Sequence, residues 1–163
     1  MKNSTLVHIE RDNKYLMMHR TKKKKDVNED KWVAPGGKFE EKESPEECAF
    51  RETKEETGLI LEDYRLRGIV TFISDKWETE YMHIFSAYSF SGELKKDCPE
   101  GELQWVDKKE IYNLPIWIGD KIFLRLIESP ETPFFSLKLE YKGEKLVSAV
   151  LNNEILNLKE QNL

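Results

Sequence analysis

The chain of 163 residues is poor in cysteine, with Cys48 and Cys98 as its only two. Disulfide frameworks need more cysteines than this, and zinc sites need them closely spaced. We therefore expect two reduced thiols, which is typical of a cytoplasmic protein. Long apolar runs are also missing, so we expect neither a membrane span nor a signal peptide.

Positive charge is not in excess either. Lys and Arg number 26 against 31 Asp and Glu, which gives a net charge of −5. Proteins that bind nucleic-acid polymers usually carry a basic surface, so we expect a small-molecule partner instead. The length predicts one domain over residues 1–151, followed by a tail at 152–163 that is either a frayed helix or disordered. Whether the protein is a monomer or a homodimer stays open.

Hydrophobic periodicity predicts a fold of the α+β class, with a mixed sheet between helices. The polar segment 22–31 contains four consecutive lysines, which we interpret as a solvated loop with no assigned role, although they could steer a polyphosphate. We expect strands at 4–11, 15–20, 64–74, 82–90, 103–106, 134–141 and 145–151. We expect helices at 45–57, at 107–114 behind a capping box of Asp107 and Glu110, and at 119–127.

The helix at 45–57 has unusually complete boundary signals. Ser44 is a good N-cap, Pro45 fits the first helical position, and Glu47 can close a capping box with Ser44. Gly58 provides the stop. The sequence therefore fixes this helix locally.

One side of this helix carries three carboxylates. Glu52 lies three and four positions before Glu55 and Glu56, and Arg51 is a possible partner for Glu55. Hard oxygen ligands at this density suit Mg²⁺, and a free Gly37 carbonyl could add a fourth ligand. The alternative interpretation is a solvated acidic surface with Arg51 as its counter-ion.

The order of these residues resembles the Nudix box, G-x5-E-x7-R-E-U-x-E-E-x-G-U. One position departs from it, because Thr53 stands where an aliphatic residue is usual. The resemblance implies a Nudix hydrolase with an α/β/α sandwich and a mixed sheet between helices. The matching residues are Gly37, Glu43, Arg51, Glu52, Glu55, Glu56, Gly58 and Leu59.

The resemblance also implies a metal centre of Mg²⁺ or Mn²⁺. Glu52 would be the base that accepts a proton from the attacking water, with Arg51 and Glu55 beside it as catalytic residues and Glu43 bracing the loop. For Glu100 alone, an ordinary surface acid is an equally good interpretation. The implied metal ligands are Gly37, Glu52, Glu55, Glu56 and Glu100.

Beyond the box, the chain is similar to the MutT-like branch, which includes the 8-oxo-dGTP diphosphatases. Phe72 and Trp117 would line or sandwich a purine, Asp120 would bond its Watson–Crick edge, and Lys38 would contact the substrate. The alternative is that both aromatic residues are core and Asp120 is a helix N-cap. Two departures bear on the substrate: Val33 and Gly119 replace polar residues of the human-type enzyme.

We therefore expect a metal-dependent pyrophosphohydrolase that cleaves an oxidised purine nucleoside triphosphate, such as 8-oxo-dGTP, to the monophosphate and pyrophosphate. Its role would be nucleotide-pool sanitation, and so DNA repair. One alternative is a Nudix hydrolase of ADP-ribose, a nucleotide sugar or a capped RNA end. The other is a nucleotide-sensing module without catalysis.

Overall fold

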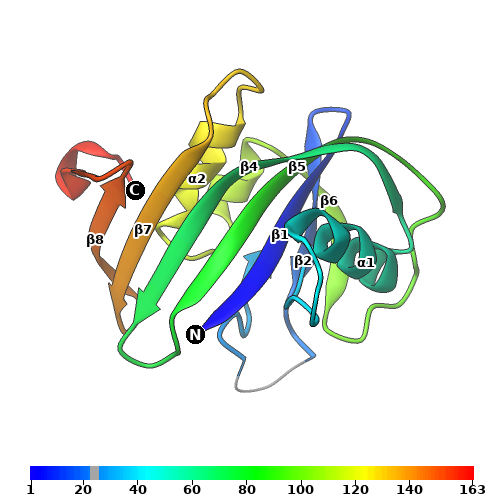
Figure 1. Ribbon diagram of the computed structural model, residues 1–163, viewed down its shortest axis with the longest axis horizontal. Coiled ribbons are helices and arrows are strands. Elements are labelled where there is room, and N and C mark those ends of the chain that lie inside the picture. The colour runs from blue at the N-terminus through cyan, green and yellow to red at the C-terminus, as the bar shows by residue number, and fades with distance from the viewer. Residues whose placement is uncertain (23–25) are drawn as a thin grey trace.

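The computed structural model describes residues 1–22 and 26–163, which form a nine-stranded sheet with a helix on either face (Figure 1). Three of the four consecutive lysines, at 23–25, lie outside the described residues. The strands are β1 (Lys2–Arg11), β2 (Lys14–His19), β3 (Trp32–Val33), β4 (Ile60–Ser74), β5 (Glu80–Ser91), β6 (Glu102–Asp107), β7 (Phe135–Lys142), β8 (Lys145–Leu151) and β9 (Glu154–Ile155).

The order across the sheet is β3-β2-β1-β5-β4-β7-β8-β9, and β6 pairs with β2. Strand β1 runs parallel to β5, and β4 runs parallel to β7, while the other pairs are antiparallel. The predicted mixed sheet and α+β class are therefore confirmed.

Tight turns join the predicted hairpins. Asp12 and Asn13 both have positive φ angles, 51° and 61°, between β1 and β2. Asn and Asp tolerate this left-handed region better than most residues, which is why this dipeptide can close a hairpin. Gly143, with φ 60°, does the same between β7 and β8.

Helix α1 (Pro45–Thr57) has the predicted boundaries and caps. The Ser44 hydroxyl accepts from the Glu47 N–H at 3.1 Å, and the Glu47 carboxylate accepts from the Ser44 N–H at 3.2 Å. Gly58 ends the helix with φ 81°, in the left-handed conformation that glycine adopts without strain. The capping box thus fixes the register of the acidic side chains that follow.

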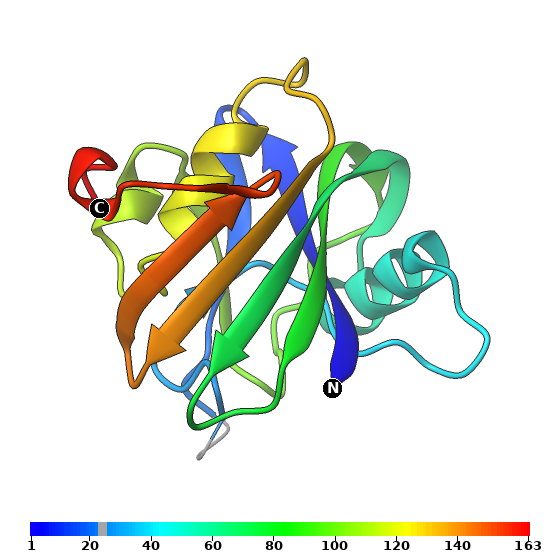
Figure 2. The same cartoon turned by 60° about the vertical axis from the view of Figure 1, so that its left-hand side comes forward.

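The two helices cover opposite faces of the sheet (Figure 2). Helix α1 buries Ala49 against Val7 and Phe85, whereas helix α2 (Asp120–Ile127) buries its apolar side against Val70 and Ile84. Side chains alternate along a strand, so β5 sends Phe85 toward α1 and Ile84 toward α2. Each face of the sheet therefore has its own core.

Two segments of the structure differ from the predicted secondary structure. The segment after β6 forms only a short 3-10 helix, η1 (Glu110–Asn113), and its N-cap Lys109 has no side-chain cap bond. Asp107 instead accepts from the Lys109 N–H at 2.9 Å, so the predicted second capping box is wrong. A carboxylate two residues before a backbone N–H favours a local turn over a helical cap.

The C-terminal segment, which we expected to be a frayed helix or disordered, folds back on α2. It forms β9 and a second 3-10 helix, η2 (Leu158–Glu160). The Arg125 guanidinium donates to the carbonyls of Gln161 and Asn162. None of the helices among the described residues has the length and apolar character needed to cross a membrane.

Candidate functional site

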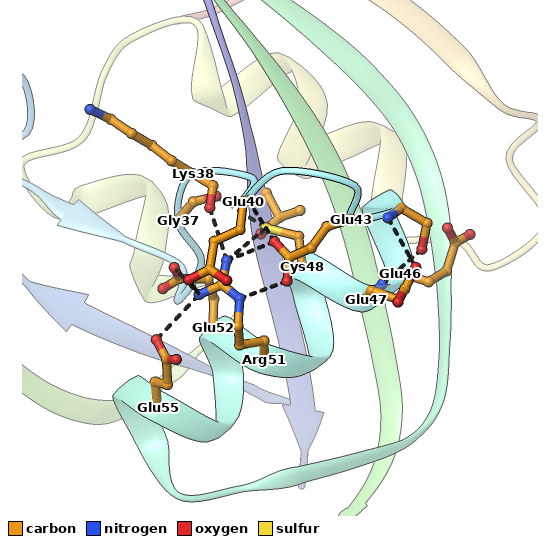
Figure 3. A network of polar contacts seen from close by, with 12 residues as sticks. Gly37, Lys38, Glu40, Glu43, Glu46, Glu47, Cys48, Arg51, Glu52 and Glu55 are labelled. Atoms are coloured by element: carbon orange, nitrogen blue, oxygen red, sulfur yellow. Dashed lines mark hydrogen bonds and ion pairs between the residues drawn. The ribbon is translucent and has the colours of Figure 1, made fainter.

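Arg51 is the centre of a polar network on α1 (Figure 3). Its Nε and Nη2 atoms donate to both Glu43 carboxylate oxygens, at 2.6 and 2.8 Å. Its Nη1 donates to Glu52 at 2.8 Å, and Nη2 also reaches the Lys38 carbonyl at 3.0 Å. These bonds lower the pKa of Glu43 to about 2 and raise the pKa of Arg51. Arg51 therefore ties the loop before α1 to the acidic side of the helix.

Glu52 lies directly over the backbone of Gly37. A Cβ atom at position 37 would come within 2.4 Å of the Glu52 carboxyl carbon, so any side chain there would displace Glu52. The Gly37 carbonyl, however, accepts from the Thr5 N–H at 2.9 Å and from the Cys48 thiol at 3.5 Å. The Gly37 carbonyl thus already has hydrogen-bond donors, because β1 packs against this loop. Its assignment as a metal ligand stays a prediction.

Glu56 is the most buried acid of the cluster, with only 7% of its surface exposed. One oxygen accepts from the Gly36 N–H at 3.2 Å, and the other has no partner among the described residues. Burial raises the pKa of Glu56 to about 9, and repulsion by the charges of Glu100 and Glu52 adds to this. Burial also raises the pKa of Glu52. Burial, and for Glu56 also the neighbouring carboxylates, thus disfavours the charged form of these two acids.

Arg20 is the cation on the other side of this cluster. It donates to Glu100 at 2.6 Å and to Asp26 at 2.9 Å. Glu100 is therefore held near Glu56 rather than pointing freely into solvent. Sequence reasoning missed Arg20 because its contact with Glu100 joins residues 80 positions apart, and no local pattern marks it.

Glu55 is placed differently from the other acids. Its side chain is exposed and accepts from Arg51 at 3.3 Å on the outer side of the network (Figure 3). It does not line the cavity described next, whereas Glu52 and Glu100 do. The structure thus brings Gly37, Glu52 and Glu100 together, with Glu56 beneath them.

A cavity of about 380 Å³ extends from these acids toward α2. Its volume falls within the range usual for small-molecule sites. The apolar side chains that line the cavity come from strands of the sheet and from loops, including the one that precedes α2. The residues that line the cavity include Ser4, Leu6, Arg20, Asp26, Asn28, Val33, Gly36, Gly37, Lys38, Glu52, Phe72, Glu80, Met82, Glu100, Trp117 and Asp120.

Phe72 and Trp117 lie at the end of the cavity remote from the acids. Their ring centroids are 5.2 Å apart in an edge-to-face contact, and Tyr141 packs against both. A base cannot enter between rings that touch, so the predicted sandwich is wrong for this arrangement, whereas the predicted lining role fits. The Tyr141 hydroxyl accepts from the Gly119 N–H at 2.8 Å, which fixes the start of α2.

Asp120 is the first residue of α2, and Gly119 rather than Asp120 is the N-cap. Burial raises the pKa of Asp120 to about 7, while the charge of Lys31 partly opposes this. No residue in the described ranges makes a hydrogen bond to this carboxyl group. Asp120 thus presents an unused polar group to the cavity, and Lys38 lines the cavity near the acids.

Two groups of lining residues were not predicted. Asn28 accepts from the Trp117 indole N–H at 3.0 Å, and the segment 26–31 that carries it has no periodic pattern. Ser4 donates to Glu80 at 2.5 Å across the parallel pair β1 and β5. The strand alternation could have identified Ser4, because it shares a face with Leu6.

The donor chemistry of the cluster fits a divalent cation. Glu56 has a buried oxygen without a partner in the described chain, and burial, together with the nearby charge of Glu100, raises its pKa. Within residues 1–22 and 26–163, no three acidic, histidine or cysteine side chains are yet close enough to enclose an ion. Mg²⁺ usually retains several waters and binds through few carboxylates, so such a cage is not required.

Comparison with known proteins gives one consistent family. Residues 2–127 match the NUDIX domain family. A protein from Bacillus subtilis named uncharacterized Nudix hydrolase YvcI is 43% identical over 93 residues, covering 55% of this chain and 59% of the relative. The oxidized purine nucleoside triphosphate hydrolase of Danio rerio is 34% identical over 107 residues, covering 64% of this chain and 67% of the relative.

A solved structure is similar over almost the whole chain. The crystal structure of the mutator MutT protein from Bacillus halodurans superposes with a TM-score of 0.81 at 30% identity. The superposition covers 94% of this chain and 99% of the other. The superposed region therefore extends beyond residue 127, where the match to the family ends, and includes part of the C-terminal hairpin of β7 and β8.

Proposed function

This chain belongs to the NUDIX family, and from that premise we propose that it is a metal-dependent pyrophosphohydrolase of nucleoside triphosphates. The observation that carries the proposal is the buried acid cluster at one end of a nucleotide-sized cavity. Glu52 and Glu100 face that cavity, and Glu56 lies beneath it with an unsatisfied oxygen. The substrate proposed first is an oxidised purine triphosphate such as 8-oxo-dGTP.

The acids have two tasks in this proposal. Glu52, Glu56 and Glu100 would hold Mg²⁺ or Mn²⁺, and Glu55 would serve as a further ligand or positioning group. The bound ion supplies a water of lowered pKa and compensates phosphate charge. The Gly37 carbonyl would be the backbone ligand, in addition to the hydrogen bonds that it accepts from the Thr5 N–H and the Cys48 thiol.

Glu52 is the proposed general base. Arg51 donates to one of the Glu52 carboxylate oxygens at 2.8 Å, and the Gly37 backbone lies against the carboxyl group and restricts its movement. A base fixed in this way needs little rearrangement to accept a proton from the attacking water. The raised pKa of Glu52 also brings its basicity closer to that suited to neutral pH.

The other end of the cavity would receive the base. Phe72 and Trp117 provide an apolar wall, and Asp120 provides a hydrogen-bonding group that no described residue uses. Lys38 lines the cavity near the acids and would contact the phosphates, which are the charged part of the substrate. The curated relative from Danio rerio, named for oxidized purine triphosphates, supports this substrate class.

We also propose a cytoplasmic location and a role in nucleotide-pool sanitation, and thereby in DNA repair. Cys48 and Cys98 are free thiols, which is usual in reducing compartments. The proposed partner is a small nucleotide rather than a nucleic-acid polymer, since the net charge is −5.

A substrate panel tests the proposal. Pyrophosphate or monophosphate release would be measured with Mg²⁺ for 8-oxo-dGTP, 2-oxo-dATP, the ordinary dNTPs, ADP-ribose and a nucleotide sugar. We expect 8-oxo-dGTP to lead by about tenfold or more in kcat/KM, which corresponds to about 1.4 kcal/mol. A preference for ADP-ribose or the sugar would overturn the substrate assignment, and no hydrolysis at all would favour a sensing role.

A further inference from the structure

Asn28 presents an amide group to the cavity in a fixed orientation. The Trp117 indole N–H lies 3.0 Å from the Asn28 Oδ1 atom. Indole nitrogen can only donate, so the amide oxygen, and not the amide nitrogen, must face Trp117. The Nδ2 group therefore keeps its two hydrogens, and no residue in the described part of the chain accepts from them. Asn28 thus offers a donor to whatever enters the cavity.

The segment 26–31 holds Asn28 in place. The Arg20 N–H donates to the Lys31 carbonyl at 2.9 Å, and the Asp30 N–H donates back to the Arg20 carbonyl at 2.7 Å. Within the segment, the Lys31 N–H donates to the Asn28 carbonyl at 2.9 Å. The Arg20 side chain also bonds Asp26. A donor on such a braced loop loses little conformational entropy when it binds a ligand.

Asp120 is the second unused polar group at this end of the cavity. The lining of the same cavity includes Val33, Phe72 and Met82, which cannot form strong hydrogen bonds. Polar groups placed beside such apolar side chains orient a ligand and provide specificity. Asn28 and Asp120 would therefore decide which edge of a base is accepted.

The two groups suit one class of purine. A 6-keto purine has an acceptor at O6 beside a donor at N1–H, whereas a 6-amino purine has a donor beside an acceptor. An amide N–H₂ group matches the O6 acceptor, and a carboxyl oxygen matches the N1–H donor. With a 6-amino purine both contacts would be mismatched, and buried polar groups left unpaired are costly.

We propose that Asn28 is a specificity-determining residue that donates from Nδ2 to the 6-keto oxygen of the base while Asp120 meets N1–H. The inference rests on the proposed function, because it assumes that a nucleotide base occupies this end of the cavity. It assigns the site to 6-keto purines and gives the segment 26–31 a part in substrate choice. Nothing in the Nudix box indicates this role.

The pair dITP and dATP tests the inference, because these nucleotides differ only at the 6-position edge. Asn28→Asp keeps an oxygen for Trp117 and removes the amide donor. We expect the wild type to favour dITP in kcat/KM by about tenfold or more. In Asn28→Asp, kcat/KM for dITP should fall by about tenfold to a hundredfold, while dATP changes by less than about threefold.

Two further variants separate recognition from folding. Asn113→Asp makes the same charge change at an exposed site outside the cavity, and both substrates should keep their wild-type values. Asn28→Ala also removes the Trp117 bond and should lose the dITP preference. An equal loss for dITP and dATP in Asn28→Asp would overturn the inference, because it indicates a purely structural role through Trp117. Lack of a dITP preference in the wild type would overturn it as well.

Binding of the monophosphates distinguishes failure of the inference from failure of the proposed function. Calorimetry of dIMP and dAMP without metal reports on the base site alone. If the wild type hydrolyses no triphosphate but prefers dIMP in an Asn28-dependent way, the proposed function fails and the inference stands. If dIMP and dAMP bind equally, or neither binds, the inference fails whatever the hydrolysis result.

Discussion

The Glu52 carboxylate lies close to the Cα atom of Gly37. A Cβ atom at position 37 would be only 2.4 Å from the Glu52 carboxyl carbon. These two residues are 15 positions apart and belong to a loop and a helix. Their contact explains why a glycine precedes the acidic helix. It also couples the position of the proposed base to the backbone of the loop.

Replacement Gly37→Ala should therefore displace Glu52. The φ angle of Gly37 is not in the left-handed region, so the substitution strains the backbone little. We expect a stability change below about 1 kcal/mol and a fall in kcat of about tenfold or more. Thermal melting and steady-state kinetics measure these two effects.

A matched glycine tests whether the effect is local. Gly143 has φ 60° and no atoms near its Cβ position, so Gly143→Ala should lose about 1 kcal/mol in stability and keep its activity. In the background Glu52→Gln, Gly37→Ala should lower kcat little further, because the affected group is already removed. Independent, additive effects of the two changes would contradict the coupling.

The ion pair of Arg51 and Glu43 should make α1 sensitive to acid. The pKa of Glu43 is lowered to about 2 from an ordinary value of 4.5, chiefly by its bonds to Arg51. The stabilisation is complete above pH 4.5 and is lost as the pH falls toward 2. Arg51→Ala should therefore cost about 1–3 kcal/mol at neutral pH and less at pH 3. Urea denaturation at both pH values measures this difference.

Lys54→Ala is a suitable comparison, because Lys54 is a basic residue of the same helix and is exposed. Its cost should stay within about 0.5 kcal/mol at both pH values. An Arg51→Ala cost that does not change between pH 7 and pH 3 would be inconsistent with the ion pair as its source.

Glu56 should make the metal-free protein less stable at high pH. The pKa of Glu56 is raised from 4.5 to about 9, so folding retains a proton that the unfolded chain releases. Its favourable contribution is complete below pH 4.5 and declines as the pH rises toward 9, at most by about 1.4 kcal/mol per pH unit. Glu56→Gln should remove this decline in denaturation experiments with chelator between pH 5 and pH 9.

Addition of Mg²⁺ extends this test to the metal. The melting temperature of the wild type at pH 8 should rise with Mg²⁺ and return to its initial value with chelator. Glu56→Gln should show a smaller rise, because a proposed ligand is lost. Equal Mg²⁺ responses of the two proteins would argue against Glu56 as a ligand.

Substrate discrimination should depend on pH through Asp120. The pKa of Asp120 is raised from 3.8 to about 7 by burial, and Lys31 is the cation that opposes this. Above pH 7 the group is a carboxylate that accepts from N1–H, and below it is increasingly protonated. The kcat/KM ratio of dITP to dATP should thus rise between pH 6 and pH 8, and Asp120→Asn should abolish the change. A ratio that rises equally in the variant would exclude Asp120 as its source.

Local signals explain how much of the fold could be predicted. Ser44 and Gly58 fix α1 through bonds within four residues, and Asp12–Asn13 fixes the first hairpin in the same way. The prediction of a capped helix at 107–114 was wrong, because Asp107 accepts a hydrogen bond from the N–H of its near neighbour Lys109 instead of capping a helix. Such competition between a turn and a cap depends on backbone geometry, which the residue types leave open.

The site was predictable only where its residues share one element. The spacing of Glu52 and Glu56 on α1 follows from the helical repeat, but the exposure of Glu55 depends on how Arg51 is shared. The contacts of Arg20 with Glu100 and of Asn28 with Trp117 join residues 80 and 89 positions apart. The fold alone brings these together.

Product analysis with a single nucleoside triphosphate tests the central claim most directly. The wild type with Mg²⁺, the wild type with chelator and Glu52→Gln with Mg²⁺ would be compared by chromatography of the nucleotides and assay of pyrophosphate. We predict monophosphate and pyrophosphate in equal amounts from the wild type with Mg²⁺, none with chelator, and kcat lowered about a hundredfold or more in Glu52→Gln. Release of diphosphate and inorganic phosphate, or an unchanged rate in Glu52→Gln, would contradict the account.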